Sequence, residues 1–397
     1  MAGTVPPRVA VVGGSLGGLT AALVLRKIGC DVEVFERGSE RLHGRGVGIV
    51  LQPDTVRWFE RSGSVDAGPV STGSSRLRYL RRDGGVEYEG PSRWRFASWN
   101  AIYRPLLADF GTSRYHLGEG FVGFDRHPEG VALRFASGRQ ERADLAVFAD
   151  GISSTARRRI LPEVIPHYAG YVGWRGTVTE AELSAETAAL FEDALIYAVV
   201  PSGHIVGYFI PGPDGELTQR RRDFNYVWYR NVPPGPALDE LLTDRKGTPC
   251  AVSVHPGMVQ QRFLGELREA ARDRLPPALE EAVTRTPEPF IQPIFDVEVP
   301  KMAFGRVCLI GDAAFAARPH PAAGTAKAAA DGWALAEALR AADFDVPAAL
   351  AKWERAQLAL GRSVVARGQE MGRRSQFDSS WQPGDPSLAF GLYGPGR

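Results

Sequence analysis

Two apolar runs near the start of the chain flank a stretch with helical spacing. Residues 9–12 (Val-Ala-Val-Val) and 32–35 (Val-Glu-Val-Phe) are short and apolar in character, as is typical of buried parallel strands. Between them, residues 19–27 carry apolar side chains at the period of a helix, and Gly29 follows as a helix end. The pattern predicts a strand–helix–strand unit at the start of an α/β domain.

The rest of the hydrophobic pattern divides into helical and alternating segments. Helical spacing recurs in five segments, residues 54–62, 99–110, 262–275, 276–286 and 347–372. Strand patterns predict a hairpin over 76–88, short antiparallel strands between 115 and 135, an aromatic-rich antiparallel sheet from 168 to about 232, and further strands at 145–149, 291–299 and 307–310. We expect the glycine- and proline-rich tail after Arg374 to pack as an arm or to be loosely ordered.

These segments predict a discontinuous nucleotide-binding domain with an inserted sheet domain. The Rossmann-like domain is expected from residues 1–70, 97–165 and 289–345, because its strands and turns fall in these ranges. The antiparallel sheet, expected to bind the substrate, comprises residues 71–96 and 166–288. Residues 346–397 are expected to form C-terminal helices and a tail.

The first predicted turn has the chemistry of a dinucleotide site. The run Gly13-Gly14-Ser15-Leu16-Gly17-Gly18 separates the first strand from the helix, and Glu36 ends the second strand. Gly13 allows a tight turn, and Gly18 allows close packing of helix on strand. The helix N-terminus offers N–H groups to a pyrophosphate, and Glu36 can accept hydrogen bonds from ribose hydroxyls. Ser15 departs from the usual glycine, although its hydroxyl can itself donate to a phosphate.

Composition narrows the class of protein. The 397 residues carry 47 basic and 46 acidic side chains, and a net charge of +1 gives no electrostatic case for binding nucleic acid or a membrane surface. No apolar run approaches the roughly 20 residues that span a bilayer. The first strand begins within ten residues, so we expect no signal peptide and a cytoplasmic protein. The three cysteines are far apart, which predicts neither a disulfide framework nor a metal site.

Two later strands end in turns of the same kind. Asp150-Gly151 follows the strand at 145–149 and precedes a Ser/Thr-capped helix start. Gly311-Asp312 follows the strand at 307–310 and precedes an alanine-rich helix. Acids and glycines at the carboxyl ends of parallel strands predict that both turns face a ligand.

In order and spacing, these three turns resemble those of the single-component FAD-dependent aromatic hydroxylases, the group typified by para-hydroxybenzoate hydroxylase. The resemblance covers residues 8 to about 345. It implies bound FAD, NADH as transient electron donor, O2 as co-substrate, and a flavin C4a-hydroperoxide that hydroxylates a small electron-rich aromatic or N-heteroaromatic ring. It also implies a homodimer.

The resemblance assigns cofactor roles residue by residue. Asp312 matches the acid that holds the ribityl hydroxyls, and Pro319 and Gly324 match residues that line the isoalloxazine. Phe315, Ala322 and Ala326 depart from the family pattern, where histidine, glycine and asparagine are common. The full predicted cofactor-binding set is Gly13, Gly14, Ser15, Leu16, Gly18, Glu36, Arg37, Arg45, Gln52, Arg104, Asp150, Arg157, Gly311, Asp312, Pro319, Ala322, Gly324 and Thr325.

Candidate catalytic residues are His320, Tyr208 and Tyr171. His320 is next to Pro319 at the expected flavin face, and histidine titrates near neutrality. Tyr208, Tyr171 and also Tyr226 can donate or accept from the sheet, although most aromatic residues there are expected to be core. Arg175 can pair with flavin or with a carboxylate, whereas His204 and His255 are interpreted as turn residues.

Three alternatives stay open at this point. A flavin epoxidase or oxidase would share the turns and differ in its product. A partner-binding protein could retain the nucleotide fold without chemistry. A nicotinamide-only dehydrogenase would leave the second and third turns without a ligand.

Overall fold

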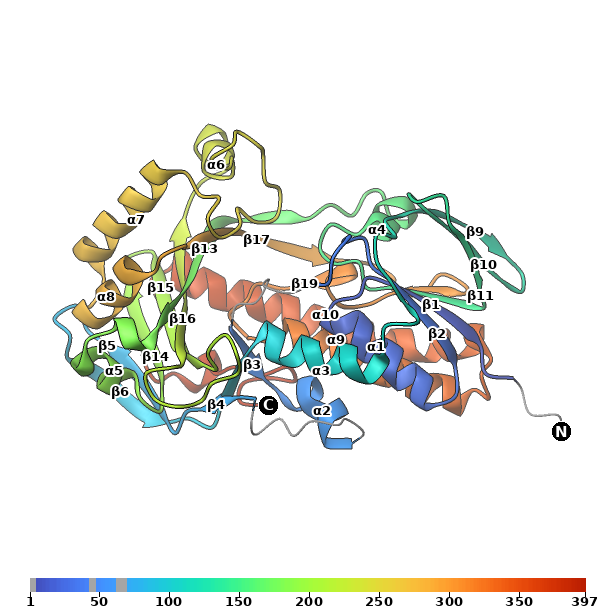
Figure 1. Ribbon diagram of the computed structural model, residues 1–397, viewed down its shortest axis with the longest axis horizontal. Coiled ribbons are helices and arrows are strands. Elements are labelled where there is room, and N and C mark those ends of the chain that lie inside the picture. Colours follow the sequence, from blue (N-terminus) through green and yellow to red (C-terminus); the bar gives the residue numbers. More distant parts are fainter. Residues whose placement is uncertain (1–4, 43–47, 62–69) are drawn as a thin grey trace.

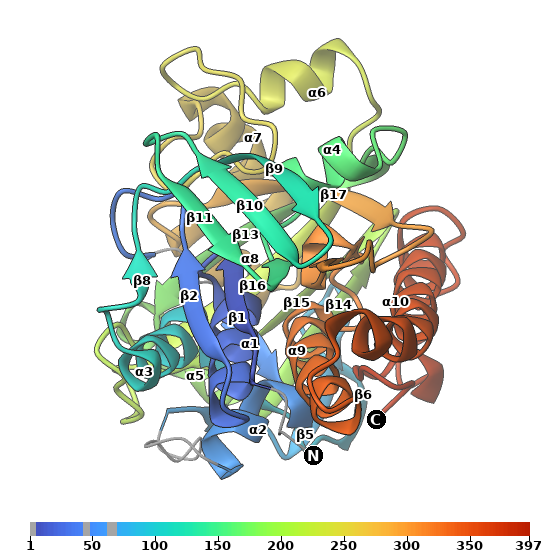
Figure 2. The same cartoon turned by 90° about the vertical axis from the view of Figure 1, so that its right-hand side faces the viewer.

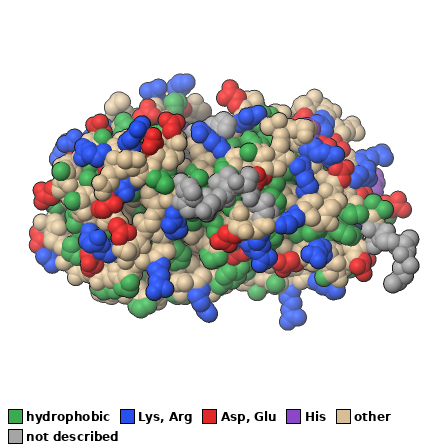
Figure 3. Space-filling view, turned by 60° about the horizontal axis from the view of Figure 1, so that its bottom comes forward, with side chains coloured by type: hydrophobic (Ala, Val, Ile, Leu, Met, Phe, Trp, Pro, Cys, Tyr) green, Lys and Arg blue, Asp and Glu red, His purple; other side chains and the backbone are tan. Residues whose placement is uncertain are grey.

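The computed structural model describes residues 5–42, 48–61 and 70–397. A parallel sheet with its helices forms one end of the molecule, and a larger sheet forms the other (Figure 1). The long helix α10 (Val346–Gln376) runs alongside both ends. Acidic and basic side chains are interspersed on the face in Figure 3, in keeping with the net charge of +1.

The first predicted strand is at the centre of a five-stranded parallel sheet. Four of the five residues in β1 (Arg8–Val12) are buried, because the strand has a neighbour on each side and is covered on both faces. The strand order is β18-β12-β1-β2-β8. The other strands are β2 (Asp31–Phe35), β8 (Tyr115–His116), β12 (Leu145–Phe148) and β18 (Val307–Leu309).

Helices cover one face of this sheet and a small sheet covers the other (Figure 2). Helix α1 (Leu16–Lys27) packs on α9 (Gly324–Ala341), where a Cβ on Gly332 would lie 2.9 Å from the Ala21 Cα atom. Helix α3 (Trp99–Phe110) packs on α1 and is capped by the Ser98 side chain. The antiparallel strands β9 (Phe121–His127), β10 (Gly130–Phe135) and β11 (Gln140–Ala143) form the opposite layer.

An eight-stranded sheet forms the other end, in the order β19-β17-β13-β16-β15-β14-β5-β6. Its strands are β5 (Arg76–Leu80), β6 (Val86–Pro91), β13 (His167–Thr179), β14 (Ala194–Val200), β15 (Gly203–Ile210), β16 (Asp223–Asn231), β17 (Phe290–Glu298) and β19 (Phe315–Ala316). Helices α5 (Ala185–Phe191), α6 (Pro236–Leu241), α7 (Gln261–Arg274) and α8 (Pro277–Arg285) share a core with one face.

Shorter elements join the two ends. Strands β3 (Gly48–Leu51), β7 (Arg95–Ser98) and β4 (Thr72–Gly73) form a three-stranded sheet. The remaining elements are α2 (Pro53–Arg61), α4 (Thr155–Ile160) and the 3₁₀ turns η1 (Glu180–Glu182), η2 (Gly311–Ala313) and η3 (Pro386–Leu388).

The predicted fold class is confirmed: a Rossmann-like unit, an antiparallel sheet and C-terminal helices are all present. Every predicted helix is found within a few residues of its expected ends, although α5 and α6 were not expected. Strands β17 and β19 belong to the large sheet although they lie in the range expected for the cofactor domain, and the domain boundaries stay a prediction. Among the described residues, no helix has the length and apolar character to cross a membrane.

Replacing Gly18 with alanine tests the close packing of α1 on the first turn. A Cβ there would lie 1.9 Å from the Gly13 carbonyl oxygen, so we expect Gly18→Ala to lower the free energy of unfolding by about 3 kcal/mol. Gly265→Ala is the matched control, because Gly265 is also helical and nothing lies within 4 Å of its added Cβ. Gly265→Ala should raise the free energy of unfolding by about 1 kcal/mol, and urea denaturation measures both variants. If both changes alter the free energy of unfolding equally, the packing argument is wrong.

Candidate active site

Two cavities meet at the carboxyl ends of the parallel strands. The larger, of about 460 Å³, extends from the first turn to the large sheet, and the smaller, of about 300 Å³, is beside the end of β2. Ser15, Trp99, Ala149 and Gly151 line both cavities. The cavities are therefore adjacent at the strand ends, where doubly wound sheets bind ligands.

Two helix N-termini open onto this site without side-chain caps. Ser15 precedes α1 and Ala323 precedes α9, and neither side chain makes a capping hydrogen bond. Their first-turn N–H groups are therefore available to a ligand, and both helix dipoles favour negative charge. Gly13 has φ +104°, and a Cβ there would lie 2.3 Å from the Ala149 carbonyl oxygen, so the turn requires glycine.

Glu36 is fixed at the far end of the smaller cavity. One carboxylate oxygen accepts from the Gly14 N–H at 2.8 Å, and the other accepts from the Gly38 N–H at 2.9 Å. The Glu36 N–H in turn donates to the carbonyl of His116 on the edge strand β8 at 2.8 Å. Backbone N–H groups thus hold the Glu36 side chain, which lines the smaller cavity together with Arg37.

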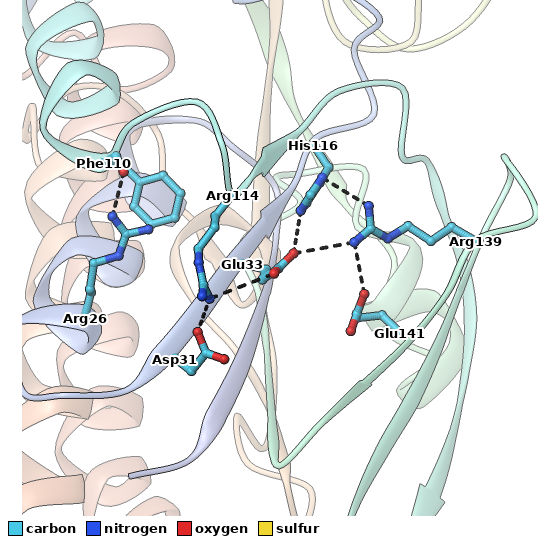
Figure 4. A network of polar contacts seen from close by, with 8 residues as sticks. All are labelled: Arg26, Asp31, Glu33, Phe110, Arg114, His116, Arg139 and Glu141. Carbon is cyan, nitrogen blue, oxygen red and sulfur yellow. Dashed lines mark hydrogen bonds and ion pairs between the residues drawn. The ribbon is translucent and has the colours of Figure 1, made fainter.

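A network of charged side chains holds β8 against β2 (Figure 4). His116 Nε2 is 2.5 Å from Glu33 Oε2, and Arg139 Nη1 is 3.0 Å from His116 Nδ1. The His116 ring also stacks on Phe35 with centroids 5.1 Å apart. Exposed ion pairs are individually weak, but the linked set fixes the edge strand next to Glu36.

The second turn is held by its own acid. Asp150 Oδ2 accepts from the backbone N–H groups of Thr155 (2.8 Å) and Ala156 (3.3 Å), while Oδ1 is buried without a partner among the described residues. Burial raises the pKa of Asp150 above its usual range, and these hydrogen bonds oppose the shift. An unpartnered buried oxygen that lines the smaller cavity fits a hydroxyl-bearing ligand.

The third turn is fixed from two sides. Arg157 is fully buried and donates from Nη1 to the carbonyls of Ala313 (3.0 Å) and Asp312 (3.4 Å). The Gly311 N–H donates to Asp331 Oδ2 at 2.8 Å, and the same oxygen accepts from Lys327 Nζ at 2.7 Å. These contacts leave the Asp312 side chain exposed to the cavity.

Asp312 is accessible through the cavity but enclosed by protein elsewhere. Loss of bulk hydration raises the pKa of Asp312 above its usual range, and the positive charges of Lys327 and Arg157 oppose the shift. Its carboxylate is the one acid of the third turn that is available to a ligand.

The large sheet supplies an aromatic wall. Side chains alternate along each strand, so Tyr208 and Tyr229 line the larger cavity while their neighbours Phe209 and Trp228 face helices α5–α8. Tyr208 stacks on Phe96 with centroids 4.0 Å apart. Burial raises the pKa of Tyr229 to about 12, and so both rings stay protonated at neutral pH.

His320 joins this wall as a neutral imidazole. Burial, together with nearby His204 and Arg318, lowers the pKa of His320 well below its usual range. Its Nε2 is 2.7 Å from the Tyr171 hydroxyl oxygen, which also accepts from Arg318. The Tyr171 O–H therefore points to Nε2 and leaves the ring proton on Nδ1, which is buried and has no partner in the described part of the chain.

Two further polar groups line the same wall. His204 is buried on β15, with Nδ1 2.6 Å from Ser375 Oγ, and burial lowers the pKa of His204 to about 3. The Arg175 guanidinium on β13 has no ion pair or hydrogen bond within the described residues. A cation without an acid partner at an aromatic cavity can hold an anionic oxygen.

Most predicted site residues line the two cavities. Those that line the larger cavity are Ser15, Leu16, Tyr208, Gly311, Asp312, Pro319, His320, Ala322, Gly324 and Thr325. The smaller cavity is lined by Gly13, Ser15, Glu36, Arg37 and Asp150.

Other predicted residues lie beside the site or away from it. Gly14 and Gly18 build the first turn, Arg157 supports the third, and Tyr171 stands behind His320. Gln52 Nε2 donates to the Ala322 carbonyl at 2.6 Å, next to the strained backbone of Ala322 (φ +53°). Arg104 is exposed on α3 and lines neither cavity, and Arg45 is outside the described residues.

The interpretation of His204 as a turn residue was wrong. His204 is within strand β15, because the hairpin turn covers only residues 201–202 and the strand begins at Gly203. Tyr226 is a core residue that faces α8, as expected for most aromatic residues of this sheet, since it alternates with Val227 and Tyr229, which line the cavity. The same alternation from Tyr208 through Val206 to His204 would have placed His204 on the cavity face.

Two family models match parts of the chain. The model described as "FAD binding domain-like" matches residues 168–296, and "Pyridine nucleotide-disulphide oxidoreductase" matches residues 8–48. The glycine turn, the free helix ends and the cavity that they share with an aromatic sheet define a flavin-dependent oxidoreductase.

Similarity over the whole chain narrows the class. The chain is 39% identical over 390 residues to 2,6-dihydroxypyridine 3-monooxygenase of Paenarthrobacter nicotinovorans, covering 97% of this chain and 96% of that protein. The structure of 2,6-dihydroxypyridine-3-hydroxylase from Arthrobacter nicotinovorans superposes with a TM-score of 0.92 at 38% identity, covering 97% of each chain. A 6-hydroxynicotinate 3-monooxygenase of Pseudomonas fluorescens is 27% identical, and the match covers 97% of this chain and 94% of that protein. The chain belongs to the FAD-dependent aromatic hydroxylases.

The residues present fit FAD. The α1 N-terminus would hold the pyrophosphate, Glu36 the adenosine ribose, and Asp312 the ribityl hydroxyls. The small residues at the start of α9 leave room for the planar ring system beside the aromatic wall. The protein is an FAD-dependent aromatic monooxygenase, and this sets aside a non-catalytic binding protein and a nicotinamide-only dehydrogenase.

Removing the Asp312 carboxylate tests its contact with the cofactor. We expect Asp312→Ala to weaken FAD binding about tenfold, because hydroxyls lose a charged acceptor. The measurement is the ratio of flavin to protein absorbance after dialysis. Asp214→Ala is the control, since Asp214 is exposed in a loop outside both cavities. Full flavin occupancy in Asp312→Ala would exclude the assignment.

Proposed function

We propose that this monooxygenase converts 2,6-dihydroxypyridine to 2,3,6-trihydroxypyridine, with NADH as the electron donor. In the balanced reaction, the substrate, O2, NADH and a proton give the trihydroxypyridine, NAD⁺ and water. One oxygen atom replaces a ring hydrogen as hydroxyl, and the other leaves as water. The relative that is 39% identical over nearly the whole chain carries this substrate in its name.

The observation that supports the substrate class is an aromatic cavity with a cation, Arg175, that has no acid partner in the part of the chain that the structure describes. Its lining includes tyrosine and histidine rings, Arg175 and Gln292. Such a cavity suits a small flat ring with polar substituents, held by a few placed groups. A ring with two hydroxyl groups activates itself toward oxygen transfer, most strongly when one is deprotonated.

Arg175 and His320 are proposed to hold the substrate as its anion. The Arg175 guanidinium supplies positive charge that stabilises a deprotonated ring hydroxyl. The neutral His320 ring offers its Nδ1–H as a donor to a substrate oxygen, with Tyr171 fixing the ring through Nε2. Burial makes His320 a poor proton acceptor at neutral pH. Its proposed role is therefore to orient the substrate and not to deprotonate it.

The remaining residues exclude water and set the ring position. Tyr208 and Tyr229 present apolar faces to the cavity. The bound flavin supplies O2 activation and oxygen transfer, and the protein supplies position and charge. The resemblance to the family supports two finer proposals as well, a homodimer and a cytoplasmic location.

The first experiment is a substrate assay on purified enzyme under air. We expect flavin absorbance bands, and NADH oxidation that 2,6-dihydroxypyridine accelerates at least about tenfold, with trihydroxypyridine as the product by mass spectrometry. The matched comparison is 6-hydroxynicotinate, whose carboxylate could also pair with Arg175. Acceleration by 6-hydroxynicotinate alone would refute the proposed substrate and retain the class of enzyme. An epoxide, or peroxide without a hydroxylated ring, would refute the proposed chemistry.

His320→Gln tests the orienting role. We expect it to raise the dissociation constant of the substrate about tenfold and to divert NADH oxidation to hydrogen peroxide, because an oriented donor is lost. Calorimetric binding and a peroxide assay measure the two effects. His255→Gln is the control, since His255 is exposed and away from the cavities. Unchanged affinity and coupling in His320→Gln would remove His320 from the site.

A further inference from the structure

The C-terminal tail packs as an arm and returns to the substrate cavity. After α10 ends at Gln376, four apolar side chains of the arm (residues 377–397) are buried, Trp381, Leu388, Phe390 and Leu392. The C-terminus lies near the middle of the molecule beside the three-stranded sheet (Figure 1). Of the two expectations for this tail, the arm is confirmed.

Phe390 is the residue of the arm that lines the larger cavity. Its ring makes an edge contact with Trp94, with centroids 5.7 Å apart, and is 6.5 Å from the ring of Tyr197. Only 5% of its surface is exposed. Phe390 therefore adds a wall to the aromatic cavity from a segment more than 150 residues beyond the large sheet's tyrosines.

Arg367 of α10 holds the backbone on both sides of Phe390. Its guanidinium donates to the Gly391 carbonyl at 2.6 Å and to the Ala389 carbonyl. The Gly391 N–H donates to the Pro321 carbonyl at 3.0 Å, one residue beyond His320. Three hydrogen bonds from two other segments thus fix the position of one ring.

Gly391 allows the chain to turn directly after Phe390. It has φ +146°, and an added Cβ would lie 2.2 Å from the Gly394 carbonyl oxygen. The Gly396 N–H closes the turn by donating to the Phe390 carbonyl at 2.7 Å. The turn at Gly391 therefore helps to hold the Phe390 backbone in place.

We propose that Phe390 is a specificity-determining residue that limits the cavity to a single aromatic ring, and that Arg367 is its positioning residue. The inference rests on the proposed function for the identity of the small ring. A ring packed against a flat substrate adds contact area and excludes a fused second ring. Removing the Phe390 ring deletes one contact with the substrate and enlarges the cavity on that side.

The test compares binding of two probes to the FAD-loaded enzyme without NADH, so that no turnover occurs. The probes are 2,6-dihydroxypyridine and a dihydroxyquinoline, which has a fused second ring, and calorimetry gives their dissociation constants. We expect Phe390→Ala to weaken binding of the pyridine about tenfold while binding of the quinoline is unchanged or tighter. The preference for one ring therefore falls at least about tenfold.

Leu388→Ala is the matched control. Leu388 is equally buried on the same arm but does not line the cavity, so its loss should lower stability without changing the preference. Arg367→Lys keeps the charge but cannot donate to both carbonyls in the same geometry, so it should move the preference in the same direction. The double variant Arg367→Lys Phe390→Ala should match Phe390→Ala alone, because Arg367 acts through that ring.

The outcomes separate the two proposals. An unchanged ring preference in Phe390→Ala, or an equal change in Leu388→Ala, would overturn the role of Phe390. Wild-type enzyme that binds neither probe would overturn it as well. Enzyme that binds the pyridine without hydroxylating it refutes the proposed function, while the ring preference of Phe390→Ala still decides the role of this residue.

Discussion

The buried pair of Lys327 and Asp331 determines where the third turn lies, and the site depends on that turn. Both side chains belong to α9 and are at most 2% exposed, and the Asp331 oxygen that accepts from Lys327 also accepts from the Gly311 N–H. Burial raises the pKa of Asp331, and the charge of Lys327 opposes the shift. Removal of either partner would strand a buried charge at a cost of about 3–5 kcal/mol. The start of α9 and the end of β18 are thereby held together, which places Asp312 in the cavity.

The two ends of the molecule make different contributions to one cavity. The parallel sheet supplies backbone N–H groups and acids at its strand ends, which suit a phosphate-bearing cofactor. The large sheet supplies aromatic rings, the His204 imidazole and the Arg175 guanidinium, which has no ion pair within the described residues. Joining the two in one space puts the residues that fit FAD next to the aromatic wall.

Two of the three departures from the family pattern, Phe315 and Ala322, have local structural surroundings that accommodate them. Phe315 fills the space above Gly361 of α10, where a Cβ would lie 2.4 Å from the ring, and Lys327 Nζ is 4.8 Å from the ring centroid. Ala322 takes the left-handed conformation that glycine adopts more easily, and its carbonyl is held by Gln52.

The sequence by itself determined the local parts of this enzyme. Strand periodicity, glycine spacing and the acids after strands indicate the cofactor turns, because each turn is built from consecutive residues. Tertiary structure decided which distant residues meet. Nothing near His204 in the chain indicates Ser375, and nothing near Phe390 indicates Arg367 or the cavity. Alternation assigns a side chain to one face of a strand, but it does not say which segment covers that face, since that choice depends on contacts between residues far apart in sequence.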